Sequence, residues 1–387
     1  MNHPQESSER SRVLVAFGTR PEAIKLAPVI HSLQASQSLQ SVTYSSGQHT
    51  DLLAPFVELF GLQVDEQSEV MRPGQCLNAL LSRVIASTAE VLARVKPAAV
   101  LVQGDTTTAL GVAMAAFQTH CPVGHVEAGL RTATPDSPFP EEMNRRLISR
   151  LARWHFTATA NQSRHLIHEG IAENQIHRTG NTVVDALHSI LGTVPASPMI
   201  QKLLAETAGQ DRIVLTAHRR ENHDGLLPGY FRVLARHIRR HPRCCVIFPV
   251  HPNPAVRELA AEAFGGIPRV HLLEPLNYPD FLALLQNCWA IASDSGGVQE
   301  EAPSLGKPLF ILRESTERPE VLGTGLATLC PTAEALERGL DTLQEHPQAH
   351  RVTANPFGDG RAAERIVAVL QRDLAPHRPI PSAARAL

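Results

Sequence analysis

Short apolar runs alternate with longer amphipathic stretches along the chain, and this pattern predicts βαβ units built around parallel sheets. In the first half, residues 13–17 (VLVAF) predict a strand and residues 21–33 the helix that follows it. The run at 98–104 (AAVLVQG) is almost continuously apolar, which is typical of a central strand covered on both faces. Further strands are expected at 42–46, 122–128 and 154–160, helices at 106–118 and after residue 160, and a turn over 180–187.

The same rhythm restarts after a change of composition at 194–198 (VPASP), which is typical of a linker. Beyond it, apolar runs predict strands at 212–218, 244–250, 270–275, 289–294 and 308–313. The last amphipathic stretch, 360–374, predicts a helix, and we expect the tail 375–387 to be disordered. The chain therefore predicts an α/β fold of two Rossmann-like domains, residues 1–190 and 191–359, which face a cleft and have parallel sheets with helices on both faces.

Composition narrows the possible partners of these domains. A length of 387 residues suits two domains, and 36 basic against 38 acidic residues leave a net charge of −2. That balance argues against a nucleic-acid binder and against a polybasic membrane anchor. The six cysteines form no Cys-x-x-Cys pair, residues 1–12 do not resemble a signal peptide, and no apolar run reaches the roughly 18 residues of a membrane span. We therefore expect a cytoplasmic protein without nucleic-acid or membrane partners.

In parallel α/β sheets, ligands bind outside the carboxyl ends of the strands, so the residues that follow each strand are the candidates for chemistry. The first strand is followed by Arg20, with Lys25 one turn into the helix, which suits an anion site as well as an ordinary surface arginine and lysine. Only one glycine is present where a dinucleotide fingerprint needs three, so no nicotinamide cofactor is expected.

Three acidic residues follow strands or loops on the same predicted rim. Asp105 follows the central strand, Glu127 the next strand, and Glu141 a proline-rich loop. Asp105 alone could simply cap the following helix. Three carboxylates at one rim exceed what capping requires, and carboxylates are the usual groups for moving protons.

In the second half, His218 ends a strand and is followed by two arginines, a combination that suits a phosphate charge. Ser295, Gly296 and Gly297 open a helix, where small residues let backbone amides approach phosphate oxygens, and Glu301 lies about one turn further on. The alternative is an ordinary serine N-cap with a glycine-rich turn. We attribute two histidine groups to chance in a chain with 19 histidines and expect no metal site; they are His165, His168 and Glu169, and His237 and His241.

Taken together, these segments resemble one family, the non-hydrolysing UDP-N-acetylglucosamine 2-epimerases of bacterial surface-polysaccharide synthesis. The matching stretches run in order from residue 17 to 322, with an extension to about 367. They include FGTRPEAIKLAPVI, GQHTDLL, VQGDTTTALG, GHVEAGLRT, PFPEEMNRR, TAHRREN, SDSGGVQEEAPSLGKP and TERPEVL. The resemblance implies a GT-B-type fold, a C-terminal helix that packs back on the first domain, and no cofactor. It also implies elimination of UDP to a 2-acetamidoglucal and re-addition with inversion at carbon 2.

The resemblance assigns roles to individual residues of this chain. Asp105, Glu127, Glu141 and His218 match the catalytic set, and Asp105, Glu127 and His218 would also touch the substrate. The remaining substrate contacts would be Arg20 and Lys25 at an anion-binding entrance, Leu276 through its backbone, Phe281 at the uracil, Ser295, Gly296 and Gly297 at the phosphates, Glu301 at the ribose, and Arg318 at the diphosphate. Gln48, His49 and Arg72 lie where contacts to an activating second UDP-N-acetylglucosamine would fall.

Several alternatives stay open at this point. They are a hydrolysing 2-epimerase, a 2-epimerase acting on a UDP-diacetamido-uronate, a glycosyltransferase of the same fold, and a catalytically inactive nucleotide-sugar binder. A glycosyltransferase has no need of three carboxylates in the first domain, and an inactive binder would not require the intact catalytic set. We expect a homodimer whose partners are a UDP-sugar substrate and a UDP-N-acetylglucosamine effector, with domain closure on binding.

Overall fold

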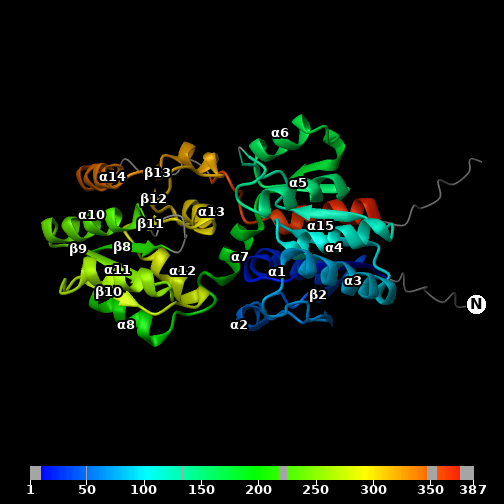
Figure 1. Ribbon diagram of the computed structural model, residues 1–387, viewed down its shortest axis with the longest axis horizontal. Helices are drawn as coiled ribbons and strands as arrows, with labels where there is room; N and C mark the ends of the chain where they lie inside the picture. The colour runs from blue at the N-terminus through cyan, green and yellow to red at the C-terminus, as the bar shows by residue number, and fades with distance from the viewer. Residues whose placement is uncertain (1–9, 49, 133, 218–224, 347–354, 375–387) are drawn as a thin grey trace, which may run out of the picture. The chain divides into compact units, whose positions relative to one another are not determined.

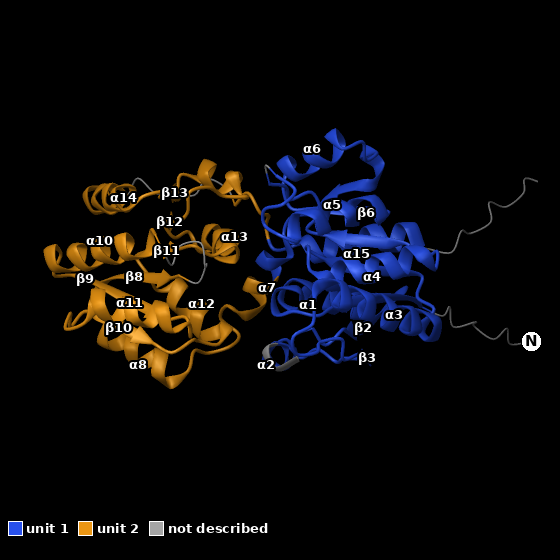
Figure 2. Cartoon of the chain, viewed as in Figure 1, with its two compact units in different colours: residues 1–185, 360–387 blue, residues 186–359 orange. Residues whose placement is uncertain are grey.

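The computed structural model describes residues 10–48, 50–132, 134–217, 225–346 and 355–374. The chain divides into two compact units, residues 1–185 with 360–387 (unit 1) and residues 186–359 (unit 2), coloured separately in Figure 2. The division falls after Asp185, whereas the sequence placed the boundary after residue 190.

Unit 1 contains a seven-stranded parallel sheet with the order β3-β2-β1-β4-β5-β6-β7. Its strands are β1 (Ser11–Phe17), β2 (Leu39–Ser45), β3 (Glu66–Gln67), β4 (Ala99–Gln103), β5 (Val123–Val126), β6 (Trp154–Thr157) and β7 (Ile176–Arg178). Its helices are α1 (Arg20–Gln34), α2 (Thr50–Leu59), α3 (Leu77–Val95), α4 (Thr107–Gln118), α5 (Glu141–Leu151), α6 (Ala160–His168), α15 (Ala362–Leu374) and the start of α7 (Thr182–Ile190). Strand β4 is buried along its whole length, as its apolar sequence predicts for a central strand.

Unit 2 contains a six-stranded parallel sheet with the order β10-β9-β8-β11-β12-β13. Its strands are β8 (Asp211–Thr216), β9 (Cys244–Pro249), β10 (Val270–Leu273), β11 (Ala290–Ser293), β12 (Leu309–Ile311) and β13 (Ala327–Leu329). Its helices are α8 (Pro198–Glu206), α10 (Leu227–Arg240), α11 (Pro254–Phe264), α12 (Tyr278–Gln286), α13 (Gly296–Leu305) and α14 (Ala333–Glu345). The prediction of an α/β fold with two Rossmann-like parallel sheets is thus confirmed.

The last helix of the chain belongs to unit 1, where it packs against α1, the first helix (Figure 1). The Asp185 carboxylate accepts hydrogen bonds from the backbone amides of Ala362 and Ala363 at 3.2 and 2.8 Å, so it caps the start of α15. At the other end of the helix, the Trp154 indole donates to Asp373 at 2.7 Å. Polar contacts at both ends therefore fix α15 to the first sheet.

Two helices differ from the sequence-based expectation. The turn expected over 180–187 is limited to its first residues, because Asn181 Oδ1 accepts the Val183 amide at 3.1 Å and α7 begins at Thr182. The Gly-Asn pair was a correct turn signal, but the amphipathic residues behind it form a helix. The 19-residue helix α3 was not predicted, and its buried face includes Leu80, Val84 and Val91. In the part of the chain that the structure describes, no helix is both long and apolar enough to cross a membrane.

Candidate active site

The predicted acidic residues of unit 1 lie at the carboxyl edge of its sheet, near the point where the strand order reverses its direction. Strand β1 continues to β2 on one side, while its other neighbour, β4, continues to β5 on the opposite side. The loops that follow two such strands diverge, which leaves room for a ligand at the carboxyl edge of the sheet. Residues 18–22 follow β1 and residues 104–108 follow β4, so both segments lie at this point.

Glu22, which received no role from the sequence, joins these two segments. One oxygen of its buried carboxylate accepts hydrogen bonds from the Gly18 amide and from the amide and hydroxyl of Thr19, at 2.8–3.0 Å. The other oxygen accepts the Thr106 hydroxyl at 2.7 Å. Burial raises the pKa of Glu22 to about 6 although each of these hydrogen bonds lowers it. The Glu22 carboxylate therefore joins the β1–α1 loop to the start of α4.

Glu127 forms an almost fully buried ion pair with Lys25. The Lys25 ammonium lies 2.7 Å from Glu127 Oε1, and the two side chains are 9% and 8% exposed. The Gln103 amide donates to the second carboxylate oxygen. The backbone of Glu127 has a φ of +66°, a conformation that is costly for a residue with a side chain and that is found preferentially at functional sites. The predicted anion-site lysine is thus bound to a predicted catalytic carboxylate.

Asp105 is held by Arg145, a buried side chain of α5. The guanidinium donates from Nε to Asp105 Oδ2 at 3.1 Å and from Nη2 to the same oxygen, and Nη1 donates to Glu142 at 2.8 Å. Capping does not explain Asp105, because the N-cap of α4 is Thr106, whose side chain accepts the Ala109 amide. The Asp105 side chain keeps 27% of its surface exposed, so it can meet a ligand.

The loop that carries Asp105 is also held by a hydrogen bond from the buried side chain of His125. Burial lowers the pKa of His125 to about 3, so the imidazole is neutral at physiological pH. Its Nε2–H donates to the carbonyl of Gly104 at 2.7 Å. Gly104 itself has a φ of +69°, which favours glycine. Backbone geometry and a buried imidazole together direct the Asp105 side chain.

The other candidates in unit 1 differ in how far their side chains are exposed to solvent. Glu141 is half-buried at the start of α5, directly before Glu142. Arg20 is exposed at the start of α1 and lies over the Phe56 ring, 5.6 Å from its centroid. Gln48 accepts the Thr108 hydroxyl at 2.7 Å, which places it beside α4.

One residue predicted to contact an effector has its described contact away from that edge. Arg72 is exposed in the segment before α3, and its guanidinium donates to the Met71 carbonyl at 3.2 Å. His49 lies outside the described residues, as does the catalytic candidate His218.

The corresponding point of unit 2 lies between β8 and β11, where the described residues at the ends of the two strands contribute hydroxyl groups and backbone amides. The hydroxyls of Thr216 and Ser293 are 2.6 Å apart at the ends of these strands, and the Ser295 amide donates to Ser293 Oγ at 3.0 Å. Ser295 is the N-cap residue of α13, but its side chain makes no capping hydrogen bond. Ser295 therefore occupies the N-cap position, as the alternative expected, but its side chain does not cap the helix. Gly296 and Gly297 carry the first two backbone amides of α13, and the helix itself provides no acceptors for them.

Arg318 lies directly beside this helix start. A Cβ atom on Gly296 would be 2.8 Å from Arg318 Nη1, so only glycine leaves room for the guanidinium here. Arg318 Nε donates to Glu300 at 2.6 Å, and its Nη1 lies 3.5 Å from Glu317. Burial would raise the pKa of Glu317, but the hydrogen bonds and charge of Arg313 lower it to about 2, which keeps this carboxylate charged. Two carboxylates thus orient Arg318 beside the amides of α13.

The three remaining unit 2 candidates lie on α12, α13 and the segment before α12. Glu301 is buried and accepts the Tyr278 hydroxyl at 2.9 Å. Leu276 and Phe281 are half-buried, just before and within α12. Tyr278 links α12 to α13, so the elements that carry these three residues are in contact.

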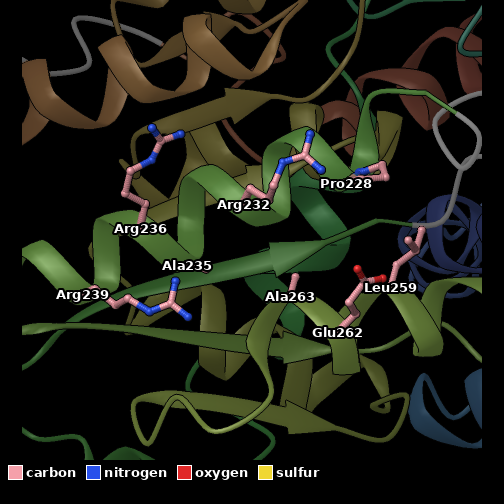
Figure 3. A pocket seen from close by; sticks show the side chains of 8 residues that line it. All are labelled: Pro228, Arg232, Ala235, Arg236, Arg239, Leu259, Glu262 and Ala263. Atoms are coloured by element: carbon pink, nitrogen blue, oxygen red, sulfur yellow. The ribbon is translucent and has the colours of Figure 1, made fainter.

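A pocket elsewhere in unit 2 has a different composition. It has a volume of about 580 Å³ and lies between α10 and α11, where Arg232, Arg236 and Arg239 are among its lining residues (Figure 3). None of the predicted site residues lines it. In Figure 3 the three guanidinium groups point in different directions, so they do not converge on one anion.

Comparisons with known proteins match nearly the whole chain to one family. The family model described as UDP-N-acetylglucosamine 2-epimerase matches residues 31–371. The chain is 41% identical over 372 residues to UDP-N-acetylglucosamine 2-epimerase of Yersinia pestis, covering 93% of this chain and 98% of the relative.

Two solved structures show the same fold. The structure of UDP-GlcNAc 2-epimerase from Neisseria meningitidis bound to UDP-GlcNAc is 39% identical with a TM-score of 0.86, and the match covers 93% of this chain and 100% of that one. The structure of the Methanocaldococcus jannaschii enzyme in complex with UDP-GlcNAc and UDP is 31% identical with a TM-score of 0.80, covering 93% and 99%.

Proposed function

Because the chain belongs to the UDP-N-acetylglucosamine 2-epimerase family and is therefore an isomerase, we propose that it interconverts UDP-N-acetylglucosamine and UDP-N-acetylmannosamine by elimination and re-addition of UDP. In the forward direction a base removes the proton from carbon 2 while the bond from carbon 1 to the UDP oxygen breaks, leaving UDP and 2-acetamidoglucal. UDP then adds back to carbon 1, and a proton is delivered to the opposite face of carbon 2. The bonds broken and formed balance without any redox cofactor.

The observation that carries this proposal is the pair of positioned carboxylates at the ends of β4 and β5. Asp105 is held by Arg145 and Glu127 by Lys25, each through a short charged contact. The proton on carbon 2 is not adjacent to a carbonyl and is therefore weakly acidic, so its removal requires a well-oriented base and assistance to the leaving group. Asp105, Glu127 and Glu141 are the groups we propose for proton transfer, in an order that we leave open.

For the UDP portion, we propose the α13 start and its surroundings in unit 2. The amides of Gly296 and Gly297 and the oriented guanidinium of Arg318 are suited to diphosphate oxygens. Glu301 is assigned to the ribose hydroxyls, Phe281 to the uracil and Leu276 to a backbone contact. His218, Arg20, Lys25 and Ser295 complete the proposed contacts to phosphate. UDP-GlcNAc in the Neisseria structure, and UDP-GlcNAc with UDP in the Methanocaldococcus one, support a UDP-sugar ligand.

A regulatory role for a second UDP-N-acetylglucosamine is part of the same proposal. Gln48, His49 and Arg72 are the proposed contacts, and the hydrogen bond from Thr108 to Gln48 supports a link to α4. The corresponding test is the reverse reaction from UDP-N-acetylmannosamine alone, which should show a lag that traces of UDP-N-acetylglucosamine remove. Immediate hyperbolic kinetics would contradict this regulation, and Arg72→Ala would then have no effect.

A supply role in surface-polysaccharide synthesis, a homodimeric state and a cytoplasmic location are proposed from the resemblance and the composition.

The decisive experiment is incubation of the protein with UDP-N-acetylglucosamine in heavy water without added NAD, followed by NMR. We expect UDP-N-acetylmannosamine with one deuterium at carbon 2, because the proton removed exchanges with solvent. Epimerised product without deuterium would exclude the elimination mechanism. Free N-acetylmannosamine with UDP would indicate a hydrolysing enzyme, and turnover only of a UDP-diacetamido-uronate would indicate the related substrate class.

A further inference from the structure

A second group of potential ligand atoms lies in unit 2 at the opposite end of the sheet from α13. His237 is in the last turn of α10, His241 follows the end of that helix, and Asp341 is on α14. The neighbouring Cys244 is the first residue of β9, so the group lies by the amino edge of the sheet. From the sequence, the two histidines were attributed to chance in a chain with 19 histidines; the fold brings Asp341 to them from α14.

The geometry of this group is compact. One ligand atom of each side chain lies within 4.8 Å of the others, and His237 Nδ1 is 4.0 Å from Asp341 Oδ1. The rings of His237 and His241 are 4.3 Å apart between centroids, with 35° between their planes. Metal–ligand bonds of about 2.0–2.2 Å require the ligand atoms to approach further. The Asp341 side chain is 46% exposed and can rotate inward, and its exposure also provides an entry path.

His237 is held in the orientation that a ligand requires. It is 4% exposed, and its Nε2 lies 3.7 Å from Cys244 Sγ, on the side of the ring away from Asp341. The Trp289 ring is nearly parallel to it, at 14° with centroids 6.5 Å apart. Histidines that bind metals usually engage the second ring nitrogen with another group, which fixes the ring. A histidine that merely fills space in the core has no need of a carboxylate facing its free nitrogen.

We propose that His237, His241 and Asp341 form a binding site for a divalent transition-metal ion of the zinc type. Two imidazoles and one carboxylate are a ligand set that zinc and its neighbours prefer, whereas calcium and magnesium require oxygen ligands. Three protein ligands leave one tetrahedral position for water. The ion joins the end of α10 to α14, two helices that already pack together, and so acts on the stability of unit 2 rather than on the proposed epimerisation.

Part of the nearby positive charge is already compensated by a carboxylate. Arg240, the last residue of α10, lies 3.1 Å from Glu337, and Arg236 lies 3.6 Å from the same carboxylate. Glu337 is one turn before Asp341 on α14 and faces these arginines instead of the histidines. This difference makes Glu337 the matched control for Asp341.

The test uses the full, untagged chain after treatment with a chelator, titrated with Zn²⁺ by calorimetry and with Co²⁺ by visible absorption. We expect one equivalent to bind with a Co²⁺ ligand-field spectrum, and Mg²⁺ to give no signal. Zn²⁺ at 100 times its dissociation constant should shift the unfolding equilibrium about 100-fold toward the folded protein. His241→Gln and Asp341→Asn should abolish binding and this shift, while Glu337→Gln retains both.

Absence of stoichiometric binding would overturn the proposal, as would equal binding by the two variants and the parent, since the ion would then be elsewhere among the 19 histidines. His241 and Asp341 are both only half-buried, so their variants should fold, and circular dichroism checks this. Turnover of UDP-N-acetylglucosamine gives a separate readout, which keeps failure of the metal site distinct from failure of the proposed function.

Discussion

The carboxyl edges of the two sheets are built on the same plan but present different chemistry. In each unit the strand order reverses its direction between two adjacent central strands, β1 and β4 or β8 and β11. In unit 1 the edge carries carboxylates paired with basic side chains, such as Glu127 with Lys25. In unit 2 it carries a glycine-containing helix start beside one oriented arginine. The topology determines where a ligand can bind, and the few residues after each strand determine what the site can do.

The difference extends to how each edge is made rigid. In unit 1, buried side chains hold one another, as Arg145 does by contacting both Asp105 and Glu142. In unit 2, the Arg318 guanidinium packs so closely on the backbone of Gly296 that a Cβ atom there would require it to shift. We therefore expect unit 1 substitutions to act on the rate of proton transfer and unit 2 substitutions to act on UDP affinity.

The largest effect should come from removing the unit 1 carboxylates. Asp105→Asn and Glu127→Gln each retain size and hydrogen-bonding capacity but lose the ability to take up a proton, so turnover should fall by roughly 10²–10⁴-fold. UDP affinity, measured by calorimetry, should stay unchanged in Asp105→Asn, because Asp105 pairs with Arg145 and not with a proposed phosphate contact. Glu66→Gln is the control, because Glu66 pairs with Arg94 and lies on β3, the outer strand that β2 and β1 separate from β4 and β5. Normal turnover in both variants would remove the proton-transfer role of Asp105 and Glu127, on which the comparison rests.

A second, smaller effect concerns the buried Glu22 and tests whether the carboxyl edge of unit 1 holds a buried charge at a cost in stability. Burial raises the pKa of Glu22 from the ordinary 4.5 to about 6 in the folded protein, so the folded state binds the proton more tightly than the unfolded state. Stability from this group is therefore present below pH 4.5 and is lost as the pH rises through 6, by on the order of 2 kcal/mol.

Urea denaturation of the parent and of Glu22→Gln between pH 4 and 7.5 measures this effect. The neutral amide cannot ionise, so the difference in unfolding free energy should move in favour of the variant as the pH rises. A difference that is independent of pH would mean that the Glu22 carboxyl titrates alike in both states. Unit 1 would then tolerate the buried charge without cost.

The smallest effect is expected in unit 2 from Gly296→Ala. The added methyl group displaces the Arg318 guanidinium, so UDP should bind about tenfold more weakly, a loss of about 1.4 kcal/mol. Gly323→Ala is the control, because a Cβ there meets no atom within 4 Å. Unchanged UDP affinity in Gly296→Ala would show that diphosphate binding does not depend on the start of α13. The proposed difference between the two edges would then lack its evidence from unit 2.

The sequence predicted the alternation of strands and helices and the position of the acidic rim, because both depend on local patterns. It did not identify the partners of the acidic residues. Gln103, Glu142 and Arg145 all stand within the quoted motifs, next to residues that were selected, but their roles depend on contacts between β4, β5 and α5. Glu22 received no role from the sequence; in the structure it completes a capping box with Thr19 and also accepts the Thr106 hydroxyl from the start of α4. Side-chain pairing across distant elements is a property of the tertiary fold, which spacing along one chain does not encode.

The attachment of α15 to unit 1 has a consequence for the order of assembly during translation. All of unit 2 lies in the chain before residue 360, whereas unit 1 requires residues from both ends. The ribosome therefore releases a complete unit 2 while the first sheet still lacks the helix that packs on α1 and that Asp185 caps. The half of the protein that is synthesised first is the last to be finished, and until α15 emerges the nascent chain carries an uncovered apolar surface that is open to chaperones.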